Sequence, residues 1–335
     1  PALRPVALTL IAAALLTACG GGGGSDSDSG LPTSSTLAQQ CAANNTFAPA
    51  ANRTATLDTE RRWVRSYMDE AYLWYSDVPS VNTGDARFND SSNVGLSLFN
   101  YFSALKSPTL TASNKRRDEF SFIYPTADWE ALSQSGIVAG FGAEWIEQPG
   151  TPRRVRIGYV DPGTPAATLG LTRGMRVISV DGVSVDNDAT DAALFSPRSG
   201  QSYTFVFEGA SGVLPPVTMT AAQITKTPVQ NVETIYTPTG TVGYMTFNDH
   251  ILPAEGQLVS AFTQLKSQGV NDLVLDVRYN GGGYLYIASQ IGYMIAGSAR
   301  TSGKTFERLQ YSDKRTADTN DPANDTPFYN VASGI

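Results

Sequence analysis

The 335-residue sequence is poor in metal-ligating side chains and in positive charge, since it has one histidine, two cysteines and a net charge of −7. Metal sites need several His or Cys ligands at close spacing, so His250 and the distant Cys19 and Cys41 argue against metal chemistry. The basic runs 115–117 and 153–154 are short and are interpreted as solvated surface, which disfavours nucleic acid as a partner. No metal ion or other cofactor is expected.

Long apolar runs are also scarce. The run Val6–Leu16 follows Arg4 and is too short to span a bilayer, so residues 1–18 are interpreted as a secretory signal peptide. The text Leu-Thr-Ala-Cys that ends at Cys19 resembles the bacterial lipobox, in which the cysteine is lipidated. Residues 19–36 are rich in Gly, Ser and Asp and are predicted to form a flexible tether.

These terminal features predict where the protein acts. Gly20 after the lipidated cysteine resembles lipoproteins that are sorted to the outer membrane, so we expect a lipid-anchored protein of the bacterial cell envelope, facing the periplasm or the cell surface. Cys41 then remains as a free thiol or pairs with a cysteine elsewhere. The sequence starts at Pro1 and stops at Ile335 inside a domain-like pattern, so we expect a fragment at both ends.

Residues 37–130 are predicted to form a small, mainly helical N-terminal domain. Apolar and aromatic residues recur at helical spacing over 59–75, with Asp58 or Thr59 as the expected N-cap, and a second helix is expected over 96–105. Segment 118–124 alternates as a strand does. The aromatic stripe of the first helix is interpreted as core.

The pattern changes to short strands and tight turns over residues 131–225. Strands are predicted at 138–145, 155–160, 177–180 and 202–207, and short helices at 166–169 and 188–194. This order predicts a β-rich module with two helices.

Two segments of this module, GFGAEW from Gly140 and VDPGTPAATLGLTRGMRVISVDGVSV from Val160, resemble a PDZ domain of the bacterial protease type. The turn at Met175 departs from the family pattern. The resemblance implies that the loop Gly140, Phe141 and Gly142 binds the terminal carboxylate of a peptide through backbone N–H groups, while the next strand pairs with the peptide. The alternative is a module that serves only packing or gating.

Residues 226–335 are expected to form an αβ core. The order is strand 241–247, helix 255–268, a strand at 273–277 buried on both faces and helix 284–295, which predicts parallel pairing. Asn280 and the glycines 281–283 join the last strand to the last helix. Consecutive glycines let backbone N–H groups point outward toward a developing oxyanion. An ordinary strand-to-helix turn is the alternative.

The text GYMTFNDH from Gly243 and AFTQLKSQGVNDLVLDVRYNGGG from Ala261, behind the PDZ-like module, resembles the carboxyl-terminal processing (tail-specific) peptidases, serine peptidase family 41. The resemblance runs from about Glu60 to the last residue. It implies an α/β multidomain protein: a helical N-terminal domain over 37–130, a PDZ domain over 131–225, and an incomplete ClpP/crotonase-like core over 226–335.

The resemblance also implies a chemistry. The family uses a serine activated by a lysine, or in a minority a serine–histidine arrangement, and its oxyanion hole maps to the backbone of Gly282 or Gly283. Asp276 and Arg278 match positions that brace the preceding strand. His250, the only histidine in the sequence, is interpreted as a surface or loop-pinning residue. The alternative is a Ser-His-Asp triad, which would have to use it.

The catalytic serine and lysine are expected to lie beyond this chain. Ser298, Ser302 and Ser312 are near Lys304 and Lys314, but in loop-like text that places no hydroxyl on a sharp turn. The chain by itself is therefore expected to bind peptide and not to hydrolyse it.

Three functional hypotheses follow. The first is an exported, lipid-anchored serine endopeptidase that recognises a C-terminal or unstructured polypeptide through its PDZ domain. The second is a non-catalytic PDZ-bearing lipoprotein that binds or scaffolds peptides. The third, acyl chemistry on a thioester, is disfavoured because such cofactors are cytosolic. The expected partners are a polypeptide substrate and, through Cys19, a membrane.

Overall fold

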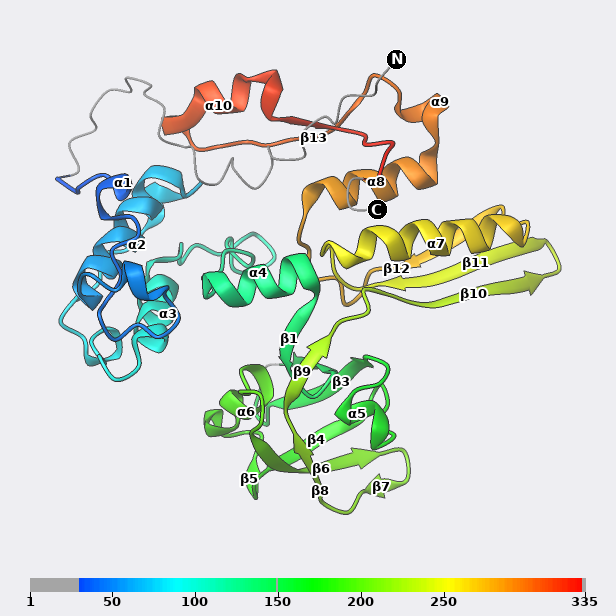
Figure 1. Ribbon diagram of the computed structural model, residues 1–335, viewed down its shortest axis with the longest axis horizontal. Coiled ribbons are helices and arrows are strands. Elements are labelled where there is room, and N and C mark those ends of the chain that lie inside the picture. The colour runs from blue at the N-terminus through cyan, green and yellow to red at the C-terminus, as the bar shows by residue number, and fades with distance from the viewer. Residues whose placement is uncertain (1–29, 149, 333–335) are drawn as a thin grey trace. The chain divides into compact units, whose positions relative to one another are not determined.

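The computed structural model describes residues 30–148 and 150–332 (Figure 1). The predicted signal peptide and Cys19 lie outside these residues. The chain divides into two compact units, the first running to Thr126 and including Leu309–Asn324, and the second comprising Ala127–Arg308 and the residues from Asp325 onward.

The first unit is helical. Its helices are α1 (Ser34–Leu37), α2 (Leu57–Ala71), α3 (Val94–Leu105) and α10 (Thr316–Asn320), with short 3-10 turns at Ala50–Asn52, Tyr75–Asp77, Ala86–Phe88, Asp313–Arg315 and Pro322–Asn324. Its core joins α2 to α3 through Val64, Met68, Phe88, Tyr101 and Leu105. Both predicted helices are therefore present.

Two details of this unit correct the sequence interpretation. The N-cap of α2 is Thr56, whose hydroxyl accepts a hydrogen bond from the Thr59 N–H, in place of Asp58 or Thr59. The strand predicted over 118–124 is wrong: the segment has no strand partner, and Phe120 is 87% exposed. Alternating aromatic residues produce a strand only where a neighbouring strand pairs with them.

The second unit begins with α4 (Thr126–Ser135) and a β-rich part. Its elements are β1 (Ile137–Gly140), β2 (Ala143–Gln148), β3 (Arg154–Val160), α5 (Pro165–Thr168), β4 (Arg176–Val180), β5 (Val183–Ser184), a 3-10 turn (Asp188–Thr190), α6 (Asp191–Phe195), β6 (Ser202–Gly209), β7 (Gly212–Val213), β8 (Val217–Thr220) and β9 (Ala222–Thr225). The main sheet has the order β2-β3-β4-β6-β7, with β5 on β4 and β8 on β6, while β1 pairs with β9. The strand predicted over 138–145 is two strands, interrupted at Phe141 and Gly142.

The last part of the second unit is a three-stranded sheet with helices. It comprises β10 (Val229–Thr237), β11 (Gly240–Phe247), α7 (Pro253–Ser267), β12 (Asp272–Asp276), α8 (Leu285–Ala296), α9 (Ser298–Thr301), β13 (Thr305–Arg308) and β14 (Asp325–Pro327). The sheet order is β10-β11-β12, and α7 lies along it (Figure 1). Strands β11 and β12 are parallel, as predicted.

Strand β12 is not buried on both faces as the sequence predicted. It pairs only with β11 among the described strands, and Val274 and Val277 are each half exposed. Leu273 and Leu275 pack against the core on one face, whereas Val274 lies on the opposite face, so the apolar composition alone overstated the burial. Buried Met245, Leu258 and Ile287 form the centre of the core between this sheet and its helices.

The molecule is thus a mixed α/β protein with several sheets. Within residues 30–148 and 150–332, no helix combines the length and apolar character needed to cross a bilayer.

Candidate functional site

The glycine turn after β12 is fastened to the segment that follows β11. The Gly281 N–H donates to the Asn248 carbonyl at 3.0 Å, the His250 N–H to the Gly282 carbonyl at 2.7 Å, and the Tyr284 N–H to the His250 carbonyl at 2.7 Å. His250 and Gly283 thereby form a parallel bridge. The parallel pairing of the two strands continues beyond their ends and fixes the path of the turn.

Glycine is required at two positions of this turn for different reasons. Gly282 and Gly283 have φ of +88° and +129°, values that side-chain-bearing residues rarely adopt. A Cβ on Gly283 would also lie 2.4 Å from the His250 carbonyl oxygen, whereas a Cβ on Gly282 would meet nothing within 4 Å. The close approach to His250 therefore depends on Gly283.

The N–H groups of these two glycines have different surroundings. The Gly282 N–H donates to Asn280 Oδ1 at 2.9 Å, and Asn280 Nδ2 donates in turn to the Phe247 carbonyl at 2.9 Å. The Gly283 N–H has no acceptor among the described residues. It lies at the entrance to α8, where aligned peptide dipoles favour negative charge. Gly283, in preference to Gly282, has the free donor.

Asp276 and Arg278 form a brace at the end of β12. The Arg278 Nε donates to Asp276 Oδ1 at 2.9 Å, and the Tyr244 hydroxyl donates to Oδ2 at 2.8 Å. The hydrogen bonds from Arg278 hold the pKa of Asp276 well below its usual range. A carboxylate held in this way stays ionised and is suited to bracing the strand, not to proton transfer.

The His250 side chain is largely enclosed. Its ring packs edge-on against Phe247 at 4.5 Å between centroids, and Nδ1 is buried without a hydrogen-bond partner. Burial lowers the pKa of His250, although hydrogen bonding at Gly282 and Asn280 opposes the shift. A neutral imidazole is therefore held behind the glycine turn.

A buried lysine lies beside the same turn. The Lys226 Nζ is 2.9 Å from Asp249 Oδ2 and 3.7 Å from Glu144 Oε2, and its side chain is 15% exposed. The Tyr159 hydroxyl donates to Glu144 at 3.4 Å. Burial lowers the pKa of Lys226, but the charges of its neighbours outweigh burial and leave it above its ordinary value. Lys226 is therefore a cation and cannot serve as a general base at neutral pH.

The candidate serines beyond the turn do not form a dyad. In the described part of the chain no serine hydroxyl is hydrogen-bonded to a lysine ammonium. The Lys314 Nζ is 2.7 Å from Asp69 Oδ2, so this lysine is ion-paired with a carboxylate and not placed against a serine. The Ser312 hydroxyl is buried without a partner, and Ser298 and Ser302 flank the short helix α9.

The loop Gly140, Phe141 and Gly142 lies between β1 and β2. The Phe141 side chain is buried and packs edge-on against Phe205 at 5.1 Å between centroids. The Ala166 N–H donates to the Phe141 carbonyl at 2.9 Å, and the Asp161 N–H donates to the Gly142 carbonyl at 2.8 Å. The carbonyl groups are thus turned inward and bonded.

The N–H groups of Phe141 and Gly142 have no acceptor in residues 30–148 and 150–332. Gly142 has φ of +78°, and a Cβ there would lie 2.2 Å from Thr164 Cβ. Strand β2, which follows the loop, pairs only with β3 and forms one edge of its sheet. The loop therefore offers two adjacent donors next to an open strand edge.

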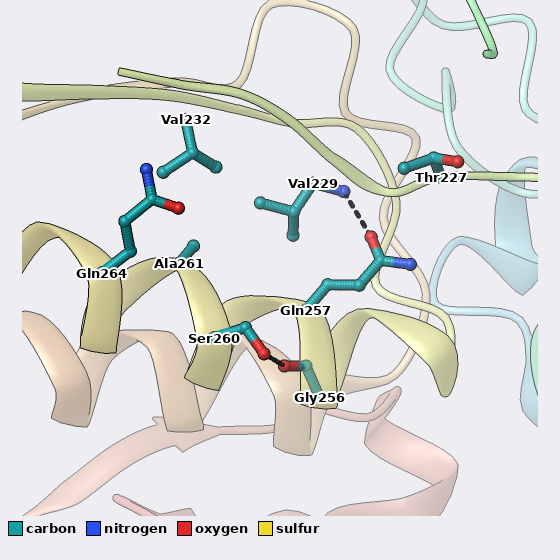
Figure 2. A pocket seen from close by; sticks show the side chains of 8 residues that line it. All are labelled: Thr227, Val229, Val232, Gly256, Gln257, Ser260, Ala261 and Gln264. Carbon is teal, nitrogen blue, oxygen red and sulfur yellow. Dashed lines mark hydrogen bonds between the residues drawn. The ribbon is translucent and has the colours of Figure 1, made fainter. Parts of the chain in front are cut away.

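Two surface hollows lie away from both glycine loops. One, of about 460 Å³, is between β10 and α7 (Figure 2), and is lined by Thr227, Val229, Val232, Gly256, Gln257, Ser260, Ala261 and Gln264. The Gln257 side chain closes one end by accepting a hydrogen bond from the Val229 N–H at 3.0 Å. The other, of about 420 Å³, follows the open edge of β12. Neither contains a residue of the Gly281–Gly283 turn.

Cysteine and acidic residues give no metal centre in the described part of the chain, where no group of three or more His, Cys, Asp or Glu side chains has suitable geometry. Cys41 is a free cysteine, and burial, together with the Glu60 carboxylate, raises the pKa of its thiol to about 11.

Comparison with known proteins finds a matching family for part of the chain. Residues 240–333, which contain the glycine turn, match the model of peptidase family S41. The chain is 30% identical over 177 residues to the chloroplastic C-terminal processing peptidase of Tetradesmus obliquus, covering 48% of this chain and 38% of that protein. It is 26% identical over 157 residues to the carboxyl-terminal-processing protease of Synechocystis, covering 46% and 36%.

Two solved structures are similar to parts of the chain. An S41 protease from Bacteroides fragilis is 25% identical with a TM-score of 0.48, covering 80% of this chain and 66% of that one. The photosystem II D1 C-terminal processing protease is 21% identical with a TM-score of 0.39, covering 70% and 64%.

The predicted resemblance to carboxyl-terminal processing peptidases of family S41 is confirmed by the family model and by the curated relatives. The chain spans less than two fifths of the length of these curated relatives.

Sequence reasoning missed Lys226 and the structural role of Asn280. Asn280 directly precedes the glycines, and an Asn before a glycine turn is a signal for a side chain that bonds local backbone. Nothing in the sequence around Lys226 marks it, because its partners Glu144 and Asp249 belong to distant segments.

Proposed function

We propose that the protein is an exported serine endopeptidase that captures a C-terminal or unstructured polypeptide on its PDZ-like module and cleaves it by a Ser/Lys mechanism. The observation that carries the proposal is the family S41 match over residues 240–333, which contain a glycine turn with a free N–H at Gly283. The substrate is a polypeptide, as the names of the matched relatives suggest.

Gly283 is assigned as the oxyanion donor. In acyl transfer a serine hydroxyl adds to the scissile carbonyl carbon while a neutral lysine takes its proton, and negative charge develops on the carbonyl oxygen. A rigid backbone N–H at that oxygen lowers the barrier, and loss of one such donor costs about 10²–10³ in kcat. The Gly282 N–H is already bonded to Asn280 Oδ1, which supports Gly283 as the donor.

The nucleophile and the base are assigned to a serine and a lysine outside residues 1–335. Two observations support this. Lys226 and Lys314 are ion-paired with Asp249 and Asp69. No hydroxyl–ammonium pair occurs within the described residues.

Peptide recognition is assigned to the PDZ-like module. Donors at Phe141 and Gly142 suit a carboxylate, and the open edge of β2 suits a peptide that adds as a further strand. A lipid on Cys19 would hold the protein at the outer membrane, facing the periplasm or the cell surface, where such polypeptides are accessible.

The experiment uses the full-length protein and one peptide prepared with a free or an amidated C-terminus. We expect the free-acid peptide to bind more tightly and to be hydrolysed, and a sulfonyl fluoride probe to label one serine C-terminal to residue 335. A folded protein that neither hydrolyses peptide nor is labelled would overturn the peptidase proposal.

A second candidate is a non-catalytic lipoprotein that binds or scaffolds peptides. The observation that favours it is that both donors and the open strand edge of the proposed peptide site lie within the described residues, among which no serine hydroxyl is hydrogen-bonded to a lysine ammonium. Tighter binding of the free-acid peptide without hydrolysis or labelling would support this candidate.

A further inference from the structure

Lys226 is the best-enclosed cation near the glycine turn and has no role in the chemistry proposed above. It lies in the connection between β9 and β10, where its own N–H donates to the Gly136 carbonyl at 2.8 Å. Its ammonium is 2.9 Å from Asp249 Oδ2 and 3.7 Å from Glu144 Oε2. Removing a lysine from water is costly unless carboxylates replace the lost hydration, as these two do.

Asp249 connects this lysine to the glycine turn. It lies between Asn248 and His250, whose backbone groups make the three hydrogen bonds to Gly281, Gly282 and Tyr284. A Cβ on Gly281 would lie 3.4 Å from Asp249 Oδ1, so the carboxylate lies next to the turn. A displacement of Asp249 would therefore be passed to the Gly281–Gly283 backbone.

The neighbourhood contains further charged groups that constrain Lys226. Tyr159 places its ring 5.9 Å from the ammonium, and Asp161 accepts hydrogen bonds at 3.0 Å from the Thr227 N–H and from Gln230. The β9–β10 connection is thus fixed at one end to Gly136 and at the other to Asp161, the residue after β3. The backbone that carries Lys226 is therefore fixed by hydrogen bonds, and its ammonium can hold Asp249 in place.

We propose that Lys226 is a positioning residue for the oxyanion turn: its ammonium holds Asp249, and Asp249 holds the 248–250 backbone on which Gly281–Gly283 is fastened. The inference rests on the proposed function for its catalytic consequence. Its structural consequence, a turn that loosens when the cation is removed, is measurable without any peptidase activity.

The test compares Lys226→Met with Lys266→Met in the full-length protein. Methionine keeps the length of the side chain and removes the charge, and Lys266 is an exposed lysine near the end of α7. Amide hydrogen exchange is measured at Gly281 and Tyr284, whose N–H groups donate to Asn248 and His250, and at Phe205 and Phe207 in β6 as a reference.

In Lys226→Met we expect the Gly281 and Tyr284 amides to exchange about tenfold faster while the β6 amides are unchanged. Peptide hydrolysis should lose at least about tenfold in kcat with KM within about twofold, because misplacing a transition-state donor affects kcat. Lys226→Arg should recover most of the loss, and Lys266→Met should behave as wild type.

Unchanged exchange and kcat in Lys226→Met would overturn the positioning role, as would a loss that extends equally to β6. If wild-type protein hydrolyses no peptide, the proposed function fails, and the exchange data alone decide the role of Lys226. Should Lys226→Met not fold, Asp249→Asn decides with the same measurements, since it removes the carboxylate that joins Lys226 to the turn.

Discussion

Two glycine loops in the second unit, Gly140–Gly142 and Gly281–Gly283, are both proposed to bind a negatively charged oxygen. They differ in the neighbouring group against which each loop packs. Each presents a backbone N–H without an acceptor in the described chain, and each contains a glycine with positive φ pressed against a neighbour. In the first loop that neighbour is the side chain of Thr164. In the second it is the backbone carbonyl of His250.

The difference bears on how rigidly each loop holds an anion. The Thr164 hydroxyl donates to the Asp161 carbonyl at 2.7 Å and accepts from the Ala167 N–H, so the first loop rests on a side chain that is held by two hydrogen bonds. The second loop rests on a main-chain carbonyl that accepts the Tyr284 N–H, so it can move only together with the backbone. A donor that must meet a developing charge at one position benefits from the second arrangement.

Replacing Gly283, where a Cβ would clash with backbone, should have the largest effect on activity. Gly283→Ala places a Cβ 2.4 Å from the His250 carbonyl oxygen, so the turn must move and carry the free N–H with it. We expect kcat/KM of the full-length enzyme to fall by about 100-fold or more, measured by peptide hydrolysis with circular dichroism as a check on folding.

The matched control is Gly269→Ala after α7, where φ is +71° but no atom lies within 4 Å of the new Cβ. It should lose about 1 kcal/mol of unfolding free energy to backbone strain and no activity. Equal activity of the two variants would show that close approach at Gly283 is unimportant for catalysis.

Replacing Gly142, where a Cβ would clash with the Thr164 side chain, should have an intermediate effect, on peptide binding. Gly142→Ala brings Cβ within 2.2 Å of Thr164, which must shift, and the Phe141 and Gly142 donors move with the loop. We expect about tenfold weaker binding of a free-acid peptide by calorimetry and a loss of about 1–3 kcal/mol in unfolding free energy.

Gly163→Ala serves as the control for this loop, because φ is +72° there and the new Cβ meets nothing within 4 Å. Its peptide affinity should stay within about twofold of wild type. A Gly142→Ala protein that binds peptide normally would remove the first loop from the recognition site.

Among the described residues, only the second loop has an N–H that donates to a nearby side chain, that of Asn280. Asn280→Ala tests this hydrogen bond. The change removes the acceptor for the Gly282 N–H and the donor to the Phe247 carbonyl. We expect about 1–3 kcal/mol less unfolding free energy in urea. Replacing the exposed Asn271 by Ala should change the unfolding free energy by less than about 0.5 kcal/mol. Equal losses in the two variants would show that the hydrogen bonds of Asn280 do not stabilise the turn.

The two loops also differ in what the sequence predicted. Both were identified, because glycines clustered at the end of a strand indicate a turn that can expose backbone N–H groups. The choice between Gly282 and Gly283 could not be made, since it depends on which N–H Asn280 accepts from. Strand β10 was missed because exposed Glu233 interrupts its apolar residues, and its pairing with β11 shifts register between Gln230 and Glu233.

Contacts between distant segments set the limit of prediction elsewhere. The alternation over 118–124 predicted a strand, but no partner strand adjoins it. The apolar run of β12 predicted burial on two faces, but only the face with Leu273 and Leu275 packs against the core, and Val274 is half exposed. In both cases the local pattern was interpreted correctly. Its outcome depends on segments that are distant in the sequence, which the local pattern does not reveal.

The smallest expected effect is a pH dependence confined to the second loop, because His250 titrates and Thr164 does not. Burial lowers the pKa of His250, so below about 6.5 the unfolded chain binds more protons than the folded one. The stabilising effect of the neutral ring is complete above that pH and is lost as the pH falls through the folded pKa.

His250→Gln should abolish this loss, so the difference in unfolding free energy between wild type and variant should narrow from pH 7 to pH 5. The raised pKa values of the buried carboxyls Glu144, Asp161 and Asp249, which burial causes, act in the opposite direction, with a stabilising effect present at low pH that is lost as the pH rises. The contributions of Glu144 and Asp161 are common to both proteins and cancel in the difference. That of Asp249 cancels only in part, because the charge of His250 lowers the pKa of Asp249. A difference that stays constant over this range would mean that His250 is not held neutral behind Gly283.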